Sequence, residues 1–162
     1  MANIQTISNS SVTLEKIFAL TSRKDISIPV DNIYMPHIYL LGDSTCQTNL
    51  EDTYPQTGWG QIFHEFLNDK CEVINLAKNG RSTKRFIEEG LHEPFKNNVK
   101  ENDIVFIQFG HNDEKEDVER HTEPFTTYQK NLLYLIDIAR KNGAIPVLLS
   151  SIYRRYFDED GK

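Results

Sequence analysis

Four short apolar runs, each followed by small polar residues or glycine, most strongly limit the folds open to this chain of 162 residues. We expect strands at 38–41, 72–77, 103–109 and 144–149. The 3.6-residue spacing of apolar side chains predicts helices between them, at 59–67, 82–91 and 125–139. Apolar strands that alternate with helices are typical of a parallel sheet covered on both faces. The sequence therefore predicts an α/β fold with three layers, α/β/α.

Two of the predicted helices have residues suited to capping at one end. Ser82 is suited to cap the helix that follows it, and Gly143 is suited to a left-handed cap after the last helix. The mixed, polar segment 1–36 shows no comparable order, and we interpret it as an N-terminal extension with a short helix or edge strand. The regular domain then occupies residues 37–162.

Composition excludes several classes of function. Hydrophobic residues make up 38% of the chain and charged residues 26%, which is typical of a globular domain. The net charge of −6 argues against a nucleic-acid partner, because phosphate contacts need a concentrated basic face. No apolar run approaches the about 20 residues that a membrane-spanning helix needs. The N-terminus lacks a signal-peptide pattern, so we expect a cytoplasmic protein, or an extracellular one if a leader has been removed.

The metal-binding and redox residues form no recognisable pattern. Cys46 and Cys71 lie far apart and belong to no C-x-x-C pair, so they predict neither a zinc site nor a disulfide framework. The five histidines show no H-E-x-x-H spacing. We therefore expect no metal ion and no cofactor.

Polar residues gather where the first three predicted strands end. Asp43-Ser44-Thr45 follows the first strand, Asn79-Gly80-Arg81-Ser82 the second, and Gly110-His111-Asn112-Asp113 the third. Each motif alone has an ordinary explanation as a turn or a helix cap. Right-handed crossovers, however, bring the carboxyl ends of parallel strands to one edge of the sheet, where open α/β sheets bind ligands. The three motifs should therefore converge on one pocket at this edge.

Taken in order, Gly42-Asp43-Ser44, Gly80 and Gly110-His111-Asn112-Asp113 resemble the first three conserved blocks of SGNH hydrolases, a superfamily of serine esterases. Further features are similar to its rhamnogalacturonan acetylesterase branch, namely Thr45, Gly58-Trp59-Gly60, the run 75–82, Phe109 and Arg154-Arg155. The resemblance extends from about residue 37 to the end of the chain. It implies a flavodoxin-like parallel sheet and the removal of acetyl groups from a carbohydrate.

The resemblance also implies the roles of single residues. Ser44 would be the nucleophile, and the oxyanion would be bound by the backbone N–H groups of Ser44 and Gly80 and by the side-chain amide of Asn112. Gly80 suits this role because a missing side chain lets the substrate approach the backbone. Residues with a substrate-binding or supporting role would be Asp43, Thr45, His111 and Arg81.

One part of the expected machinery has no counterpart in this sequence. In the family, an Asp-x-x-His segment beyond a fifth strand supplies the base, and the chain contains no Asp-x-x-His. The segments Glu89–His92 and Asp117–His121 are the nearest matches, but both lie in or near helical segments on the wrong side of the third or fourth predicted strand. We therefore expect a fold truncated after the fourth strand, and a chain that is inactive or weakly active by itself and associates with itself through that exposed strand.

Several alternatives remain open. The chain could be part of an acetylesterase whose base lies elsewhere, a non-catalytic carbohydrate-binding remnant, or a hydrolase completed by a partner chain. A lipase or thioesterase of the same fold is a further alternative. The substrate would be a small-molecule or polysaccharide ester. Arg81, Arg85 and Arg154-Arg155 could pair with an acidic, pectin-type polysaccharide or could be solvated surface charge.

Overall fold

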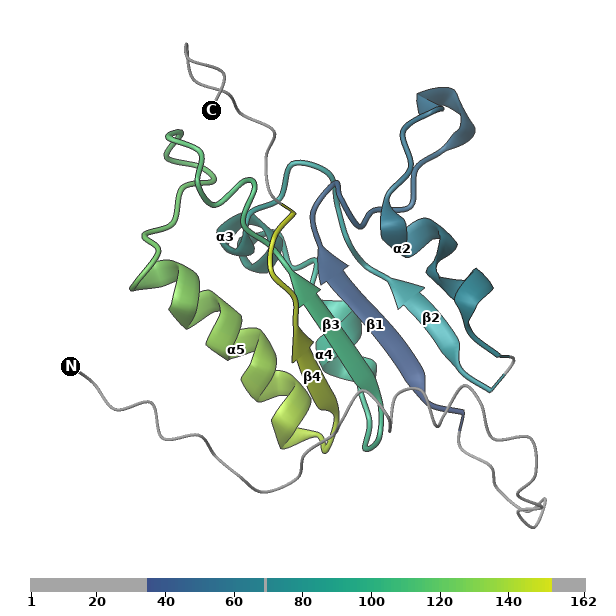
Figure 1. The fold of residues 1–162 in the computed structure, drawn as a ribbon. Helices are drawn as coiled ribbons and strands as arrows, with labels where there is room; N and C mark the ends of the chain where they lie inside the picture. The colour runs from purple at the N-terminus through teal and green to yellow at the C-terminus, as the bar shows by residue number, and fades with distance from the viewer. Residues whose placement is uncertain (1–34, 69, 153–162) are drawn as a thin grey trace. The chain divides into compact units, whose positions relative to one another are not determined.

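The computed structural model describes residues 35–68 and 70–152. Its framework is a four-stranded sheet with the order β2-β1-β3-β4, in which every pairing is parallel (Figure 1). The strands are β1 (His37–Gly42), β2 (Glu72–Asn75), β3 (Ile104–Gln108) and β4 (Ile145–Leu148). The predicted α/β fold with a parallel sheet is confirmed. Almost all of the proposed extension 1–36, as well as Arg154 and Arg155, lies outside the described residues.

The central strands have two buried faces, which explains why they are apolar along their whole length. Successive residues of a strand point to opposite faces. In β3, Val105 and Ile107 accordingly belong to one core, and Ile104 and Phe106 contribute to the other. The continuous apolar runs in the sequence are therefore the signature of a sheet covered on both sides.

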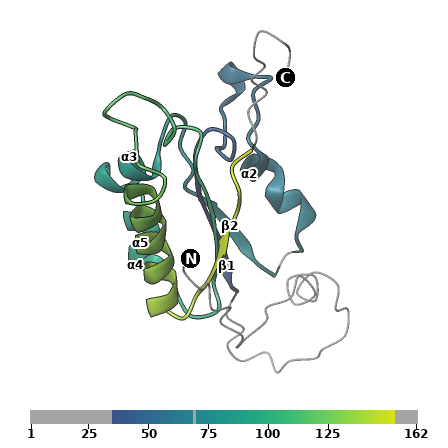
Figure 2. The ribbon, with the colours of Figure 1, turned by 60° about the vertical axis from the view of Figure 1, so that its left-hand side comes forward.

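Helices cover the two faces unequally. On one side lie α3 (Thr83–Glu88), α4 (Glu93–Asn98) and α5 (Thr127–Lys141), and on the other α2 (Trp59–Ile62) with the 3-10 helix η2 (Phe63–Phe66) (Figure 2). A further 3-10 turn, η1 (Glu51–Thr53), lies between β1 and α2. The three-layer arrangement is the one that the sequence predicted. No helix in the described parts of the chain has the length and apolarity to span a bilayer.

Some element boundaries differ from the predictions. The helix expected over 59–67 becomes a 3-10 helix after Ile62, and the one expected over 82–91 ends at Glu88. Helix α4 was not predicted, because it is one and a half turns long and buries only Phe95, which gives no periodic pattern. Residues 117–121 form turns and not a helical segment. The predicted caps are confirmed: Ser82 accepts a hydrogen bond from Arg85 N at 3.3 Å, and Gly143 adopts a φ of 74°.

A buried histidine makes this helical layer sensitive to pH. His92 lies at the start of α4 with its Nε2 3.0 Å from the Tyr134 hydroxyl on α5. Burial lowers the pKa of His92, although Glu93 opposes this effect. An unfolded chain protonates the same imidazole near pH 6.5, so acid favours the unfolded state. The contribution of His92 to stability is thus fully present above about pH 6.5 and is lost as the pH falls below that value.

We therefore expect the melting temperature of the wild-type chain to fall more steeply than that of His92→Gln between about pH 7 and pH 5. Thermal unfolding followed by circular dichroism measures both slopes. His64→Gln is the matched control, because the His64 side chain is 62% exposed and should leave the wild-type slope unchanged. Equal slopes for the wild-type chain and His92→Gln would contradict this account.

Candidate active site

The turn after β1 presents Ser44 at the carboxyl edge of the sheet. The carbonyl of Asp43 accepts hydrogen bonds from the backbone N–H groups of Cys46 and Gln47, both at 3.1 Å. The Asp43 carboxylate is buried and accepts from the backbone N–H and the hydroxyl of Thr45, both at 2.9 Å. Asp43 and Thr45 therefore build the turn. Ser44 is only half-buried, and no side chain in the described parts of the molecule hydrogen-bonds to it.

The loop between β2 and α3 lies directly beside this turn. Lys78 N donates to Gly42 O at 3.0 Å, and Asn79 N donates to Gln47 Oε1. These two contacts flank Ser44. Gly80 follows with a φ of 75°, and an added Cβ would have no atom within 4 Å. No atom therefore crowds the α-carbon of Gly80, and its left-handed φ favours a glycine at this position.

Asn112 joins the third loop to the second. Its side chain is buried, and Nδ2 donates to Arg81 O at 3.1 Å. A primary amide has two N–H groups, so this bond leaves a second donor for another oxygen. The structure therefore brings Asn112 next to Gly80-Arg81, and the contacts of the β2–α3 loop bring Gly80 to the Ser44 turn. The three strand-end motifs thus lie together at one edge of the sheet.

Asp113 fixes the position of this third loop. Its buried carboxylate accepts hydrogen bonds from the backbone N–H and hydroxyl of Thr83 and from the hydroxyl of Thr122. Burial raises the pKa of Asp113, and the hydrogen bonds from the two threonines oppose the increase. The carboxylate connects β3, the start of α3 and the loop that precedes α5. Sequence reasoning noted Asp113 in its motif but gave it no role.

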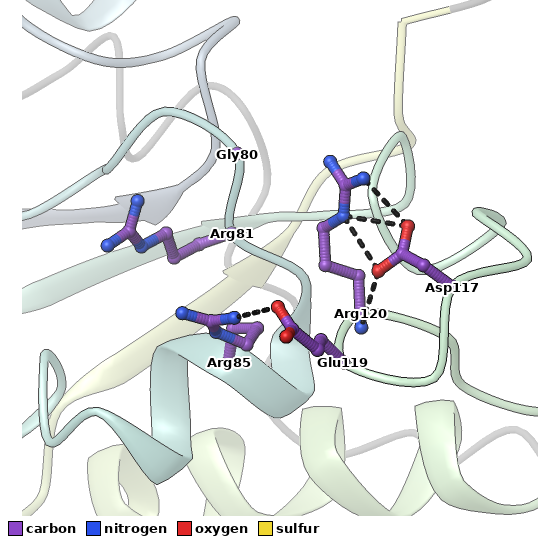
Figure 3. Close-up of a pocket in the computed structure, with 6 residues that line it drawn as sticks. All are labelled: Gly80, Arg81, Arg85, Asp117, Glu119 and Arg120. Atoms are coloured by element: carbon purple, nitrogen blue, oxygen red, sulfur yellow. Dashed lines mark hydrogen bonds and ion pairs between the residues drawn. The ribbon is translucent and has the colours of Figure 1, made fainter.

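A cleft of about 410 Å³ opens beside Gly80 (Figure 3). It is lined by Gly80, Arg81, Arg85, Asp117, Glu119 and Arg120, but by neither Ser44 nor Asn112. The arginines are paired: Arg81 and Arg85 share Glu89, with N–O distances of 2.9 and 2.6 Å. Arg85 also donates to Glu119 at 2.7 Å, and Arg120 binds Asp117. Arg81 thus lies near the expected site, but its charge is balanced within the protein.

The histidines have partners other than Ser44. The ring of His111 is hydrogen-bonded through Nε2 to the backbone carbonyl of Ile152, just after β4, a contact that orders its loop. His121 contacts Lys115 O and Glu123, and His92 contacts Tyr134. Among the described residues, no hydrogen bond joins Ser44 to a histidine.

The two sequence imitations of an Asp-x-x-His dyad do not form one. In the first, Glu89 binds Arg81 and Arg85 while His92 binds Tyr134. In the second, Asp117 binds Arg120 while His121 binds Glu123. Nor do the described residues contain a cluster of three or more His, Cys, Asp and Glu side chains placed to hold a metal ion.

Two side-chain amides that sequence reasoning missed, Asn75 and the buried Gln108, support the Ser44 turn. Asn75, the last residue of β2, donates to Cys46 O at 2.9 Å. Gln108, the last residue of β3, accepts from Trp59 Nε1 at 2.6 Å and from the Thr45 hydroxyl at 3.3 Å. Each amide is the last residue of its strand and follows apolar residues, and this polar residue at the strand end was the available signal.

Comparisons with known proteins agree with this geometry. The family model for GDSL-like lipase/acylhydrolase matches residues 38–155. The chain is 41% identical over 125 residues to "Rhamnogalacturonan acetylesterase RhgT" of Bacillus subtilis (strain 168), covering 77% of this chain and 53% of that protein. It is 44% identical over 123 residues to "Probable rhamnogalacturonan acetylesterase YesY" of the same organism, covering 75% and 56%. The chain thus spans about half the length of these relatives.

A solved structure shares the fold. The crystal structure of YxiM from Bacillus subtilis matches with a TM-score of 0.68 and 24% sequence identity, over 79% of this chain and 36% of that one. The family model covers most of the chain, and its match includes every strand of the sheet and all three strand-end motifs. The resemblance to SGNH hydrolases of the rhamnogalacturonan acetylesterase type is confirmed, and the chain belongs to the GDSL-like lipase/acylhydrolase family.

Proposed function

We propose that this domain hydrolyses acetyl esters on a carbohydrate, with Ser44 as the nucleophile. The observation that carries the proposal is the hydrogen bond from Asn112 Nδ2 to Arg81 O, which holds a neutral amide donor beside Gly80 at the edge that presents Ser44. Ester hydrolysis by serine needs an accessible hydroxyl and fixed donors for the oxyanion. The backbone N–H groups of Ser44 and Gly80 and the free N–H of Asn112 are the three donors.

The reaction follows from these roles. Ser44 Oγ attacks the acetyl carbon while a base removes the hydroxyl proton, and the carbonyl oxygen becomes an oxyanion held by the three donors. The intermediate collapses, the bond to the sugar oxygen breaks, and the sugar leaves as an alcohol with a proton from the conjugate acid. Water then attacks the acetyl-Ser44 ester with the help of the same base. Acetate leaves and the serine is regenerated.

We infer that the base comes from outside the described residues. Support comes from the five histidines, because no hydrogen bond or ion pair in the described structure joins one of them to Ser44. Their partners there include Ile152, Tyr134, Glu123, Lys115, Asp103, Glu72 and Glu65. A general base has to lie within hydrogen-bonding reach of the proton that it removes. All five histidines of the chain lie among the described residues, so we propose that the 162-residue chain by itself hydrolyses esters poorly.

The substrate proposed is an acetylated, acidic polysaccharide or oligosaccharide. The names of two relatives, rhamnogalacturonan acetylesterases, support a carbohydrate. The cleft beside Gly80 supports an acidic one, because Arg85 and Arg120 lie along it. Arg85 is held partly by Glu119, whose side chain is 77% exposed. A uronate carboxylate would take the place of that glutamate on Arg85 Nη1, while Glu89 keeps Nε and Nη2.

An external base tests the proposal directly. We expect the wild-type chain and the Ser44→Ala variant to hydrolyse p-nitrophenyl acetate at nearly equal, low rates in plain buffer. Imidazole in solution should then raise the wild-type rate above that of Ser44→Ala, because a small base can reach a half-buried hydroxyl and replace the absent one. Imidazole also cleaves the ester directly, so the Ser44→Ala rate at each imidazole concentration is the background to subtract.

The outcomes separate the alternatives. Equal rates for the two proteins at every imidazole concentration would rule out Ser44 as a nucleophile in this chain. If the chain then still bound an acetylated oligosaccharide, the carbohydrate-binding alternative would be favoured. A large Ser44-dependent rate without imidazole would mean that a residue of this chain supplies the base.

A further inference from the structure

Gln108 uses both ends of its buried side-chain amide at the base of the active-site edge. Its oxygen accepts from Trp59 Nε1 at 2.6 Å. The Thr45 hydroxyl donates mainly to Asp43 Oδ1 at 2.9 Å and shares its hydrogen with the Gln108 oxygen at 3.3 Å. Its Nε2 donates to Ser150 O, just after β4, at 3.0 Å. Rotating the amide by 180° would set its N–H groups against the indole N–H and its oxygen against a carbonyl. The orientation of the amide is therefore fixed.

These contacts close a ring around the residue next to Ser44. The backbone N–H of Trp59 donates to Thr45 O at 3.0 Å, while the indole N–H and the Thr45 hydroxyl both reach Gln108 Oε1. Thr45 is thereby held through its backbone and its side chain. The ring connects three segments that are distant in sequence: the Ser44 turn, the start of α2 and the end of β3.

The surroundings of the ring are tightly packed. A Cβ at Gly60 would lie 2.4 Å from Cys46 O, so α2 can approach the turn this closely only because residue 60 is a glycine. The Trp59 indole is held edge-on against Phe63 and Phe106, at centroid distances of 5.6 and 6.5 Å. Because the indole is packed between these rings, a displacement of Gln108 would displace Trp59, and Trp59 in turn would displace Thr45 and the Ser44 turn.

We propose that Gln108 is a positioning residue that sets the orientation of the Ser44 turn through Thr45 and Trp59. Gln108 does not touch Ser44, and its effect on the reaction is indirect. The proposal rests on the role of Ser44 as the nucleophile. It adds that the approach angle of Ser44 Oγ depends on an amide at the end of the neighbouring strand, where a misplacement of about 1 Å can cost up to about 10²-fold in rate.

The test uses the single tryptophan of the chain as a reporter. Gln108→Met has a similar length but lacks the acceptor and the donor. In ¹⁵N–¹H spectra we expect the Trp59 indole resonance to move upfield as its hydrogen bond is lost, and the backbone amide resonances of Ser44 and Thr45 to shift with it. In the imidazole assay, Gln108→Met should lower the Ser44-dependent kcat by about 10- to 100-fold and leave KM unchanged.

Gln61→Met is the matched control, because Gln61 Oε1 accepts from Asn49 N at 2.9 Å and the same substitution there removes a bond outside the ring. If Gln108→Met does not fold, Trp59→Phe removes the indole donor while keeping an aromatic ring, and it should shift the same Ser44 and Thr45 resonances. Unchanged Ser44 and Thr45 resonances, with a displaced indole resonance, would overturn the proposal, since Gln108 would then only fasten α2. If Ser44 proves not to be a nucleophile, the proposed function fails in the assay, while the resonances still decide whether Gln108 orients the turn.

Discussion

Asn112→Ala is expected to reduce the Ser44-dependent rate of ester hydrolysis by about 10²–10³-fold, the usual cost of losing one oxyanion donor. The amide is buried, neutral and tied by one N–H to Arg81 O, so its second N–H needs no reorganisation when charge develops on the substrate. The loss should appear in kcat, because the donor acts on the oxyanion and not on the ground-state ester. The imidazole assay, with Ser44→Ala subtracted, measures it.

Asn98→Ala separates this effect from a loss of stability. Asn98 lies on α4 and donates through Nδ2 to Pro94 O at 2.7 Å, so its replacement also removes a bond from an amide to a backbone carbonyl. Asn98 is exposed, so Asn98→Ala should lose about 1 kcal/mol or less of unfolding free energy, whereas Asn112→Ala, at a buried site, should lose about 1–3 kcal/mol and stay folded. Only Asn112→Ala should lose activity. A raised KM with an unchanged kcat for Asn112→Ala would show that Asn112 contacts the substrate and not the oxyanion.

Self-association through β4 is the second large effect that we expect. Among the described residues β4 is an edge strand, and Leu148 is 54% exposed on it. Unpaired apolar edges invite pairing with another chain. We therefore expect the wild-type chain to form dimers or larger species in size-exclusion chromatography with light scattering, and its melting temperature to depend on concentration. The substitution Leu148→Lys should shift the association equilibrium of the chain towards the monomer.

Leu133→Lys is the matched control for Leu148→Lys, because Leu133 is 55% exposed on α5, away from the edge. It should leave association unchanged. A wild-type chain that is monomeric at all concentrations, with a concentration-independent melting temperature, would show that the edge is protected.

Proline in β4 already protects part of this edge. Ile145 N and Leu149 N donate to carbonyls of Asp103 and Ile107, so the polar groups of Pro146 and Leu148 face away from β3. Pro146 has no N–H, which leaves Leu148 N as the outward donor of this strand. Pro146→Val restores a donor. We expect Pro146→Val to strengthen association and Leu148→Lys to weaken it. If both variants changed association in the same direction, the prediction that the chains pair through β4 would be wrong.

The sequence alone was sufficient for the features that depend on local patterns. The apolar runs gave four parallel strands in the right positions, because buried strands on a covered sheet need continuous apolar residues. The polar motifs after three of those strands gave the edge where Ser44, Gly80 and Asn112 meet, because parallel strands with right-handed crossovers end on one side. Ser82 was recognised as a cap from its place before a helical run.

Boundaries and short elements were less predictable. Helix α4 is only six residues long and buries little, so no period was available to reveal it. The segment expected to continue as a helix after Ile62 tightens into a 3-10 turn. Both cases reflect packing against the sheet, which overrides weak local preferences.

The support of the site was decided by tertiary structure. Gln108 meets Thr45 across 63 residues of sequence and Trp59 across 49, and Asp113 meets Thr83 across 30. A hydrogen bond between such distant groups has no local signature, because it exists only after the loops have been brought together. The ion pairs of the arginines also depend on the tertiary structure. The sequence showed positive charge near the site, but only the fold placed Glu89 and Glu119 close enough to balance that charge.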